Sequence, residues 1–147
     1  MTDSKVIAIG SDHAGFSLKD SVIRYLISVG YDVKDCGTQS TEPVDYPDFV
    51  PCVVNIVKNG GIGILICGTG IGMSIAANRY SGIRAARCLD TYSAEIARKH
   101  NDANILVLAG RMLGDEFALK IVNIFLNTEF EGGRHKRRID KIEELEK

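Results

Sequence analysis

Tryptophan is absent from this chain of 147 residues, and no apolar run approaches the roughly 20 residues that span a bilayer. Residues Met1–Val6 do not contain the apolar segment of a secretory signal peptide. The formal net charge of −1 indicates neither a nucleic-acid-binding nor a membrane-binding surface. We therefore expect a cytoplasmic globular protein that binds neither nucleic acid nor membrane.

The chain also lacks a CxxC pair. Its four cysteines, Cys36, Cys52, Cys67 and Cys88, are scattered and do not have the spacing of metal ligands. We expect four reduced thiols, as is usual inside cells, and neither a metal site nor a cofactor.

Proline is scarce, and all three prolines lie between residues 43 and 51. This concentration indicates an ordered loop after Cys36 that leads into a helix at about Phe49. Long loops in compact domains are usually functional or disordered. This loop carries Asp45 and Tyr46 between prolines, so Tyr46 is a candidate wall of a substrate pocket. A plain connector is the alternative.

Apolar runs and helical periodicity alternate along the chain, which predicts buried strands and amphipathic helices. The expected strands cover residues 5–10, 31–35, 62–66, 82–88 and 105–109, and the second should lie at a sheet edge. The expected helices cover residues 16–29, 49–58, 73–79, 91–100 and 114–126, and a last one starts at 134. This order predicts a single α/β domain over residues 1–147, a Rossmann-like three-layer sandwich with a five-stranded, mostly parallel sheet.

The same patterns predict helix ends and buried faces. Thr91 is a fair N-cap, and Asn101 a fair end, for helix 91–100. The last helix carries apolar residues three apart, at Ile139, Ile142 and Leu145. The residues of helix 114–126 that should face inward, or nearly so, are Phe117, Ile121, Val122, Ile124 and Phe125.

The strand at 62–66 runs through the glycine-rich turn Cys67–Gly72 into a helix. Backbone N–H groups there meet the positive end of the helix dipole, so an anion or a negatively charged transition state can bind. The same field favours the thiolate of Cys67, which could act as a base or a nucleophile. A dinucleotide fingerprint would need glycine at Met73, and no Walker A lysine follows. A tight turn without a ligand is the plain alternative.

Ligands of parallel α/β sheets bind at the carboxyl ends of the strands. That edge should collect the side chains of Asp12, His13, Asp90 and Arg111 around the Cys67–Gly72 turn. An acid, an imidazole, a thiol, an anion-binding turn and a guanidinium would then share one rim.

Other candidate residues lie away from this rim. His100 and Asn101 end a helix of about ten residues, so they should sit about 15 Å from the rim. Arg134 and Arg138 are four residues apart on a helix, which suits paired recognition of one phosphate. Alternatively, His100 could merely complement a helix C-terminus, and the arginines could belong to a solvated basic face. If they are functional, at least some of them should serve the site of a neighbouring subunit, an arrangement that a two-fold dimer would make twice.

This set of groups suits proton transfer beside a carbonyl. Removing a C–H proton there makes an enediolate, whose charge needs preorganised N–H donors like those of the glycine turn. Cys67 could take the proton and return it to the adjacent carbon, which interconverts an aldose and a ketose. His100 could move a proton on the ring oxygen while a sugar opens, and arginines could hold a remote phosphate.

Several segments of the chain match one family when they are read together. They are residues 10–15 (GSDHAG), 45–47 (DYP), 66–78 (ICGTGIGMSIAAN), 82–85 (GIRA), 97–104 (ARKHNDAN) and 132–135 (GGRH). With them the chain resembles the type B ribose-5-phosphate isomerases, whose family includes galactose-6-phosphate and allose-6-phosphate isomerases. The resemblance covers essentially the whole chain.

The resemblance implies that Cys67 is the general base, with Thr69 assisting, and that His100 opens the sugar ring. Some family members replace the cysteine by a glutamate two residues past the turn, but this chain has Met73 and Ser74 there. The implied enediolate cradle is Gly68, Gly70, Ile71 and Gly72. The implied ligands of sugar and phosphate are Asp12, His13, Asn101, Arg111, Arg134 and Arg138. The family's site lies between two subunits, so a homodimer with shared sites, or a tetramer, is expected.

The expected reaction is therefore the interconversion of ribose 5-phosphate and ribulose 5-phosphate, a step of the pentose phosphate pathway. The nearest alternative is the same chemistry on a six-carbon sugar phosphate. Alternatives from other classes are a nucleotide-binding module and a non-catalytic oligomerising domain, which would leave Cys67, His13 and His100 without a role.

Overall fold

Five parallel strands form one sheet in the computed structural model, which describes residues 5–145. The strands are β1 (Val6–Ser11), β2 (Asp32–Asp35), β3 (Ile62–Cys67), β4 (Ala85–Arg87) and β5 (Ile105–Ala109). Their order across the sheet is β2-β1-β3-β5-β4, and every pairing between neighbours is parallel. The predicted α/β class and the edge position of β2 are confirmed, and the sheet is entirely parallel.

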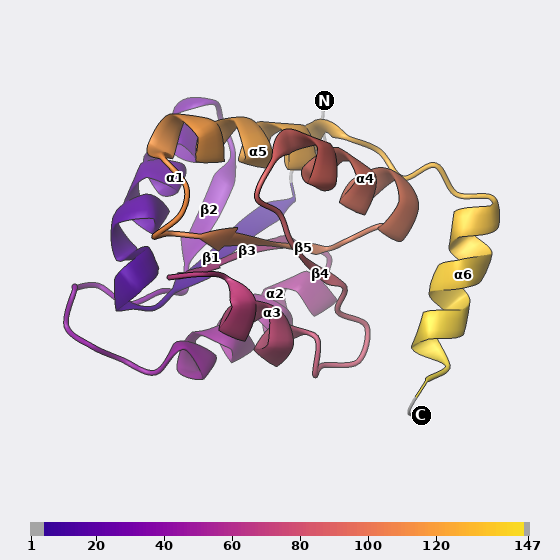
Figure 1. Cartoon of the computed structure of the whole chain (residues 1–147), viewed down its shortest axis with the longest axis horizontal. Coiled ribbons are helices and arrows are strands. Elements are labelled where there is room, and N and C mark those ends of the chain that lie inside the picture. Colours follow the sequence, from indigo (N-terminus) through magenta and orange to yellow (C-terminus); the bar gives the residue numbers. More distant parts are fainter. Residues whose placement is uncertain (1–4, 146–147) are drawn as a thin grey trace.

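Helices cover both faces of this sheet (Figure 1). The covering helices are α1 (Phe16–Ser28), α2 (Val50–Lys58), α3 (Ile71–Ala77), α4 (Thr91–Asn101) and α5 (Asp115–Asn127). Helix α6 (Arg134–Glu143) and the 3-10 helices at His13–Gly15 and Tyr46–Phe49 complete the helical elements of the described residues. One buried cluster lies between the sheet and α1, α4 and α5, and a second lies between the sheet and α2 and α3. These two apolar layers make the predicted three-layer sandwich.

One predicted helix face is partly wrong, and the apolar residues of the last helix are mostly exposed. Phe117 is 42% exposed, because the buried stripe of α5 runs through Ala118, Ile121, Val122 and Phe125 and leaves Phe117 at its margin. In α6 only Ile139 is buried among the expected apolar residues. Ile142 and Leu145, which are 49% and 69% exposed, remain open to solvent.

Local backbone chemistry moves several element ends. The N-cap of α4 is Asp90 rather than Thr91, since its carboxylate accepts a 2.6 Å hydrogen bond from the Ser93 N–H. The same helix ends on Asp102, which has a left-handed φ of 46°. Helix α3 begins at Ile71, two residues before the expected start, and β4 is shorter than the expected strand at both ends.

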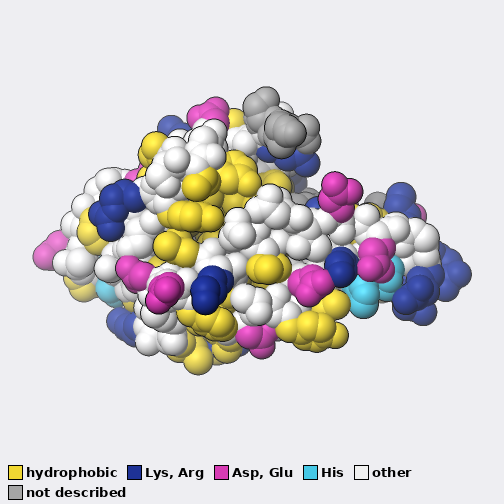
Figure 2. Space-filling model, turned by 90° about the horizontal axis from the view of Figure 1, so that it is seen from above, with side chains coloured by type: hydrophobic (Ala, Val, Ile, Leu, Met, Phe, Trp, Pro, Cys, Tyr) yellow, Lys and Arg dark blue, Asp and Glu magenta, His cyan; other side chains and the backbone are white. Residues whose placement is uncertain are grey.

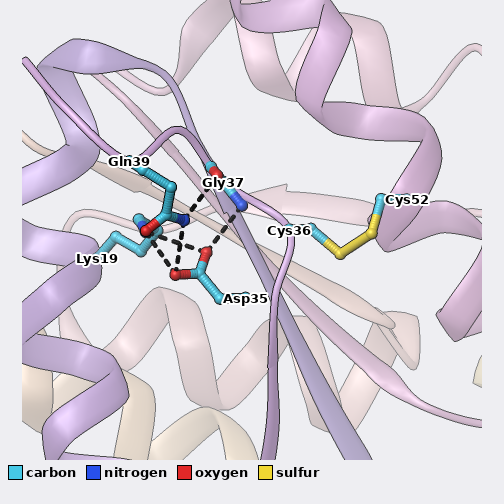
Figure 3. The surroundings of a disulfide bond; sticks show 6 residues. All are labelled: Lys19, Asp35, Cys36, Gly37, Gln39 and Cys52. Carbon is cyan, nitrogen blue, oxygen red and sulfur yellow. Dashed lines mark hydrogen bonds and ion pairs between the residues drawn. A yellow bond between two sulfur atoms is a disulfide. The ribbon is translucent and has the colours of Figure 1, made fainter.

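The expectation of four free thiols is wrong, because Cys36 and Cys52 form a disulfide (Figure 3). Cys36 follows β2 and Cys52 lies in the first turn of α2, and the proline-containing loop between them folds back to bring their Cα atoms within 5.9 Å. That separation suits a disulfide, but a sequence separation of 16 does not reveal it. Cys67 and Cys88 are free and buried.

An ion pair between a buried lysine and a partly exposed aspartate holds the end of β2 beside the disulfide. Lys19 is 2% exposed and places its Nζ atom 2.8 Å from the Asp35 carboxylate (Figure 3). Burial alone would raise the pKa of Asp35, but hydrogen bonds from Lys19, Gln39 and Gly37 outweigh it and hold the pKa below its ordinary value. The start of the proline-containing loop is therefore fixed by both a covalent bond and a charge pair.

Helix α6 lies to one side of the sheet, next to the end of α4 (Figure 1). The Arg84 guanidinium joins it to the body, 3.1 Å from Glu143 on α6 and 3.6 Å from Asp102 after α4. Within residues 5–145, no helix combines the length and the apolar character needed to cross a membrane.

Candidate active site

The turn after β3 is fixed to the neighbouring strand through backbone hydrogen bonds. Gly110 N–H donates to the Cys67 carbonyl at 2.8 Å, and Arg111 N–H donates to the Gly68 carbonyl at 2.9 Å. Gly70 takes a left-handed φ of 78°, which favours glycine. These bonds place Cys67, a residue that is 5% exposed, at the carboxyl edge of the sheet.

The same turn presents N–H groups at the start of α3. Ser74 N–H closes the first helical turn on the Gly70 carbonyl at 3.0 Å, so the preceding N–H groups have no carbonyl acceptor within the helix. The Thr69 hydroxyl accepts one of these, from Ile71 N–H, at 3.2 Å. Among the others, those of Gly70 and Gly72 remain as potential donors to an anion.

Tyr46 packs directly over this turn. A Cβ atom added to Gly72 would lie 2.5 Å from the Tyr46 ring, so only glycine allows the ring this close. The proline-containing loop therefore lies against the glycine turn, and the role of Tyr46 as a pocket wall stays a prediction.

Asp12 and His13 lie at the same rim, at the end of β1. The Asp12 side chain is 6% exposed, and its Oδ1 atom accepts hydrogen bonds from Ala14 N–H at 3.0 Å and Gly15 N–H at 3.1 Å. The His13 Nδ1 atom accepts from Val44 N–H at 3.1 Å. Each side chain is thus oriented by one atom, which leaves Asp12 Oδ2 and His13 Nε2 for a ligand.

Two arginines border the turn, and only one of them was expected. The Arg111 guanidinium packs on Gly68, where an added Cβ atom would lie 3.1 Å from Nη1. The unexpected residue is Arg87, whose Nε donates to the Thr69 carbonyl at 2.7 Å. Arg87 ends β4, so the rule that ligands gather at the carboxyl ends of strands could have identified it. The remaining rim residue, Asp90, serves as the helix cap described above.

The remaining predicted residues lie at the other end of α4. Helix α4 has 11 residues and spans about 16 Å, which separates His100 and Asn101 from the rim where the helix begins. Arg134 and Arg138 are exposed on α6, and neither has an ion pair within residues 5–145. Figure 2 shows histidine surface beside the basic side chains that gather at this end of the molecule.

His100 is held there by residues that sequence reasoning did not assign a role. Its ring stacks on the buried ring of His135, with centroids 4.1 Å apart, and the Glu131 carboxylate lies beside both rings. Burial, with the charges of His100 and Arg134, lowers the pKa of His135 below its ordinary value. The histidine in the GGRH segment was the sequence signal for this contact.

The rim and the far end therefore carry different chemistry. The rim has a thiol, free N–H donors and an oriented imidazole, which suit proton transfer to and from a small anionic intermediate. The far end has the partly exposed imidazole of His100 and two guanidinium groups without an ion pair in the described part of the chain, which suit a phosphate. Together these features define an α/β protein of the sugar-phosphate isomerase class.

Comparison with known proteins agrees with this class. Residues 7–142 match the family model described as Ribose/Galactose Isomerase. The chain is 46% identical over 144 residues to ribose-5-phosphate isomerase B of Escherichia coli, covering 97% of each chain. The chain belongs to the ribose/galactose isomerase family, so the resemblance to its type B ribose-5-phosphate isomerases is confirmed.

Solved structures give the same result for the fold. A ribose 5-phosphate isomerase from Thermotoga maritima is 58% identical with a TM-score of 0.94, covering 97% of this chain and 100% of that one. Ribose-5-phosphate isomerase B of Mycoplasma genitalium, solved with bound ribulose-5-phosphate, is 43% identical with a TM-score of 0.94, covering 99% of this chain and 98% of that one.

Proposed function

We propose that this protein interconverts D-ribose 5-phosphate and D-ribulose 5-phosphate through a cis-enediolate. The observation that carries the proposal is the position of Cys67, at the end of β3 and directly before a turn with free N–H groups. The solved relative from Mycoplasma genitalium has the same fold and binds ribulose-5-phosphate, which supports the choice of a five-carbon substrate.

In this mechanism the Cys67 thiolate removes the proton from C2 of the open-chain aldose. The electron pair moves to the carbonyl oxygen, and the N–H groups of Gly70 and Gly72 stabilise the resulting enediolate. A proton passes from O2 to O1, and the thiol returns its proton to C1 as the C2 carbonyl forms, which completes the ketose. The Thr69 hydroxyl lies beside the same turn and assists, and Tyr46 excludes water from one side.

The rest of the substrate is held by polar groups around this centre. His100 moves the proton that opens the furanose ring, and the Arg134 and Arg138 guanidinium groups bind the phosphate. The remaining sugar and phosphate ligands are Asp12, His13, Asn101 and Arg111. Binding the phosphate at a distance fixes C1 and C2 against the thiol.

The two groups of residues come from different chains of a homodimer in this proposal, or of a tetramer built from it. The length of α4 supports this, since it keeps His100 away from the rim of its own chain. Apolar surface next to the rim supports it as well, because Ile71, Ile75 and Met112 are 51%, 63% and 55% exposed. A cytoplasmic location belongs to the same proposal.

The test is an isomerase assay on ribose 5-phosphate, with allose 6-phosphate and galactose 6-phosphate as six-carbon competitors. Wild type should turn over the pentose phosphate best. Replacing the base, in Cys67→Ala, should lower kcat by about 100- to 10,000-fold, the usual range for a general base. An unchanged circular dichroism spectrum would show that the variant is folded. A near-normal rate in Cys67→Ala would refute the assignment of the base.

A further inference from the structure

Arg87 ends β4 and reaches the turn that follows β3. Strand β5 lies between these two strands in the sheet, so the side chain of Arg87 crosses the carboxyl end of β5. Its Nε donates a 2.7 Å hydrogen bond to the Thr69 carbonyl, and its Nη2 donates to the Met112 sulfur at 3.7 Å. No carboxylate forms an ion pair with Arg87 within residues 5–145. Its shortest polar contact there is with a backbone carbonyl.

Three consecutive carbonyls of the turn accept hydrogen bonds, and the third depends on Arg87. The Cys67 and Gly68 carbonyls accept from backbone N–H groups that follow β5, at 2.8 and 2.9 Å. The Thr69 carbonyl accepts only from the Arg87 side chain within the described part of the chain. A substitution of Arg87 can therefore release one peptide of the turn while the backbone bonds of the other two stay in place.

The peptide that Arg87 holds is the one that carries the Gly70 N–H group. In a trans peptide the C=O and the N–H point in opposite directions, and no peptide bond within residues 5–145 is cis. A bond that fixes the Thr69 carbonyl toward Arg87 therefore fixes the Gly70 N–H on the opposite side. Gly70 is buried, and its N–H has no acceptor in the part of the chain that the structure describes.

This peptide needs to be held because it precedes a glycine. Gly70 has a φ of 78°, and glycine populates positive and negative φ about equally. The Thr69–Gly70 peptide can therefore rotate, which would turn its N–H to the other side. A charge-assisted bond to the carbonyl opposes this rotation. The same bond polarises the peptide, which makes its N–H a stronger donor.

We propose that Arg87 is a positioning residue for the enediolate intermediate. It holds the Thr69–Gly70 peptide so that the Gly70 N–H stays directed at the developing negative charge, and it does not itself contact the substrate. The inference rests on the proposed isomerase function, in which the Gly70 N–H is one donor of the enediolate cradle. Preorganised donors of this kind act on the charge that develops in the transition state.

Two other roles of Arg87 predict different kinetics. An arginine that bound the sugar or its phosphate would change KM when it was removed. An arginine whose charge favoured the Cys67 thiolate would shift the dependence of kcat on pH when it was removed. Loss of a positioning residue lowers kcat and kcat/KM by the same factor, and it does so equally across the pH range.

The kinetic experiment uses Arg87→Met, which removes the donor, and Arg87→Lys, which keeps a donor and the charge. Complete loss of one oxyanion donor lowers kcat by about 100- to 1,000-fold. A misplaced donor has a smaller effect, so Arg87→Met should lower kcat about 10- to 100-fold, with KM within about twofold of wild type and an unshifted pH profile. Arg87→Lys should lie between Arg87→Met and wild type. Arg24→Gln, which removes an exposed positive charge from α1, should match wild type.

Ligand binding separates the intermediate from the bound substrate without turnover. The two ligands are a phosphorylated hydroxamate, which has the planar anion of the enediolate, and ribitol 5-phosphate, which has no carbonyl. Calorimetric titration should show that Arg87→Met binds the hydroxamate at least about tenfold more weakly than wild type does, and ribitol 5-phosphate within about twofold. In heteronuclear NMR spectra the Gly70 amide signal should move in Arg87→Met and stay in Arg24→Gln, because only the first variant removes the bond to its peptide.

A near-normal kcat in Arg87→Met would overturn the inference, as would a rise in KM alone, a shifted pH profile or equal weakening of the two ligands. An unmoved Gly70 signal would overturn it too, because the peptide would then not depend on Arg87. Circular dichroism shows whether the variants are folded, and Arg87→Lys carries the same comparisons if Arg87→Met is not. An inactive wild type would refute the proposed function, whereas an active wild type beside an unimpaired Arg87→Met would refute this inference alone.

Discussion

The rim of the sheet and the far end of α4 are built in different ways. Cys67 and Gly68 at the rim are fixed by backbone hydrogen bonds to the neighbouring strand end, and Asp12 by its own helix cap. At the far end, His100 rests on a ring stack, and Arg134 and Arg138 project from an exposed helix. The rim is thus preorganised by the chain that carries it, whereas the arginines proposed to bind phosphate at the far end lie on an exposed helix surface.

Mixing two inactive variants tests whether the rim of one chain and the far end of another form one active site. This experiment has the largest expected effect. Cys67→Ala and His100→Ala should each lose about 100- to 10,000-fold in kcat. After subunit exchange, mixed dimers should contain one site with both groups intact. Because random exchange makes half of the dimers mixed, activity should recover to about a quarter of wild type.

The control for this mixture is native mass spectrometry, which shows whether subunits have exchanged. Exchange without recovery of activity would mean that each site is complete within one chain. The rim and the far end would then be two parts of one site within a single chain.

Removing the disulfide tests how firmly the rim is held. The Cys36–Cys52 bond closes a loop of 16 residues that carries Val44 and Tyr46 to the active-site rim. The double variant Cys36→Ser/Cys52→Ser should lose about 3 kcal/mol in the free energy of unfolding under oxidising conditions. Urea denaturation with and without dithiothreitol measures this loss. The free energy of unfolding of wild type should fall to that of the variant only when the disulfide is reduced. Four titratable thiols in the oxidised, unfolded wild type would contradict the bond.

Arginine variants test the far end, with a matched control on the same helix. A hydrogen bond to a charged group contributes about 1.5–3 kcal/mol, so Arg138→Ala should lower kcat/KM roughly 10- to 100-fold. Arg137→Ala removes the same charge from the adjacent position, which lies with Lys136 and Lys141 on another face of α6. Its kcat/KM should stay within about twofold of wild type. Equal losses in the two variants would indicate a general field effect of α6 rather than a phosphate site.

The sequence predicted the rim better than the far end for a physical reason. Cys67 and its turn follow a buried strand directly, so periodicity and glycine spacing place them without knowledge of the fold. The stack of His100 on His135 and the Cys36–Cys52 bond join segments that meet only after folding. Asp90 replaced Thr91 as the helix cap because both residues can cap, and the backbone conformation decides between them.

The smallest expected effect concerns the contact between Tyr46 and Gly72, which joins the loop to the rim. Gly72→Ala forces the ring away, because the new Cβ atom would lie 2.5 Å from it, and overpacking of this kind destabilises by about 1–3 kcal/mol. The better helix propensity of alanine offsets up to about 1 kcal/mol of that. In Gly72→Ala/Tyr46→Ala the clash is gone, so unfolding free energy should return to that of Tyr46→Ala or slightly above it. Chemical denaturation of the four proteins forms a double-mutant cycle. If the two substitutions changed the free energy of unfolding additively, the Tyr46 ring would not rest on Gly72 in solution. The contact between the loop and the rim would then be as loose as the far end.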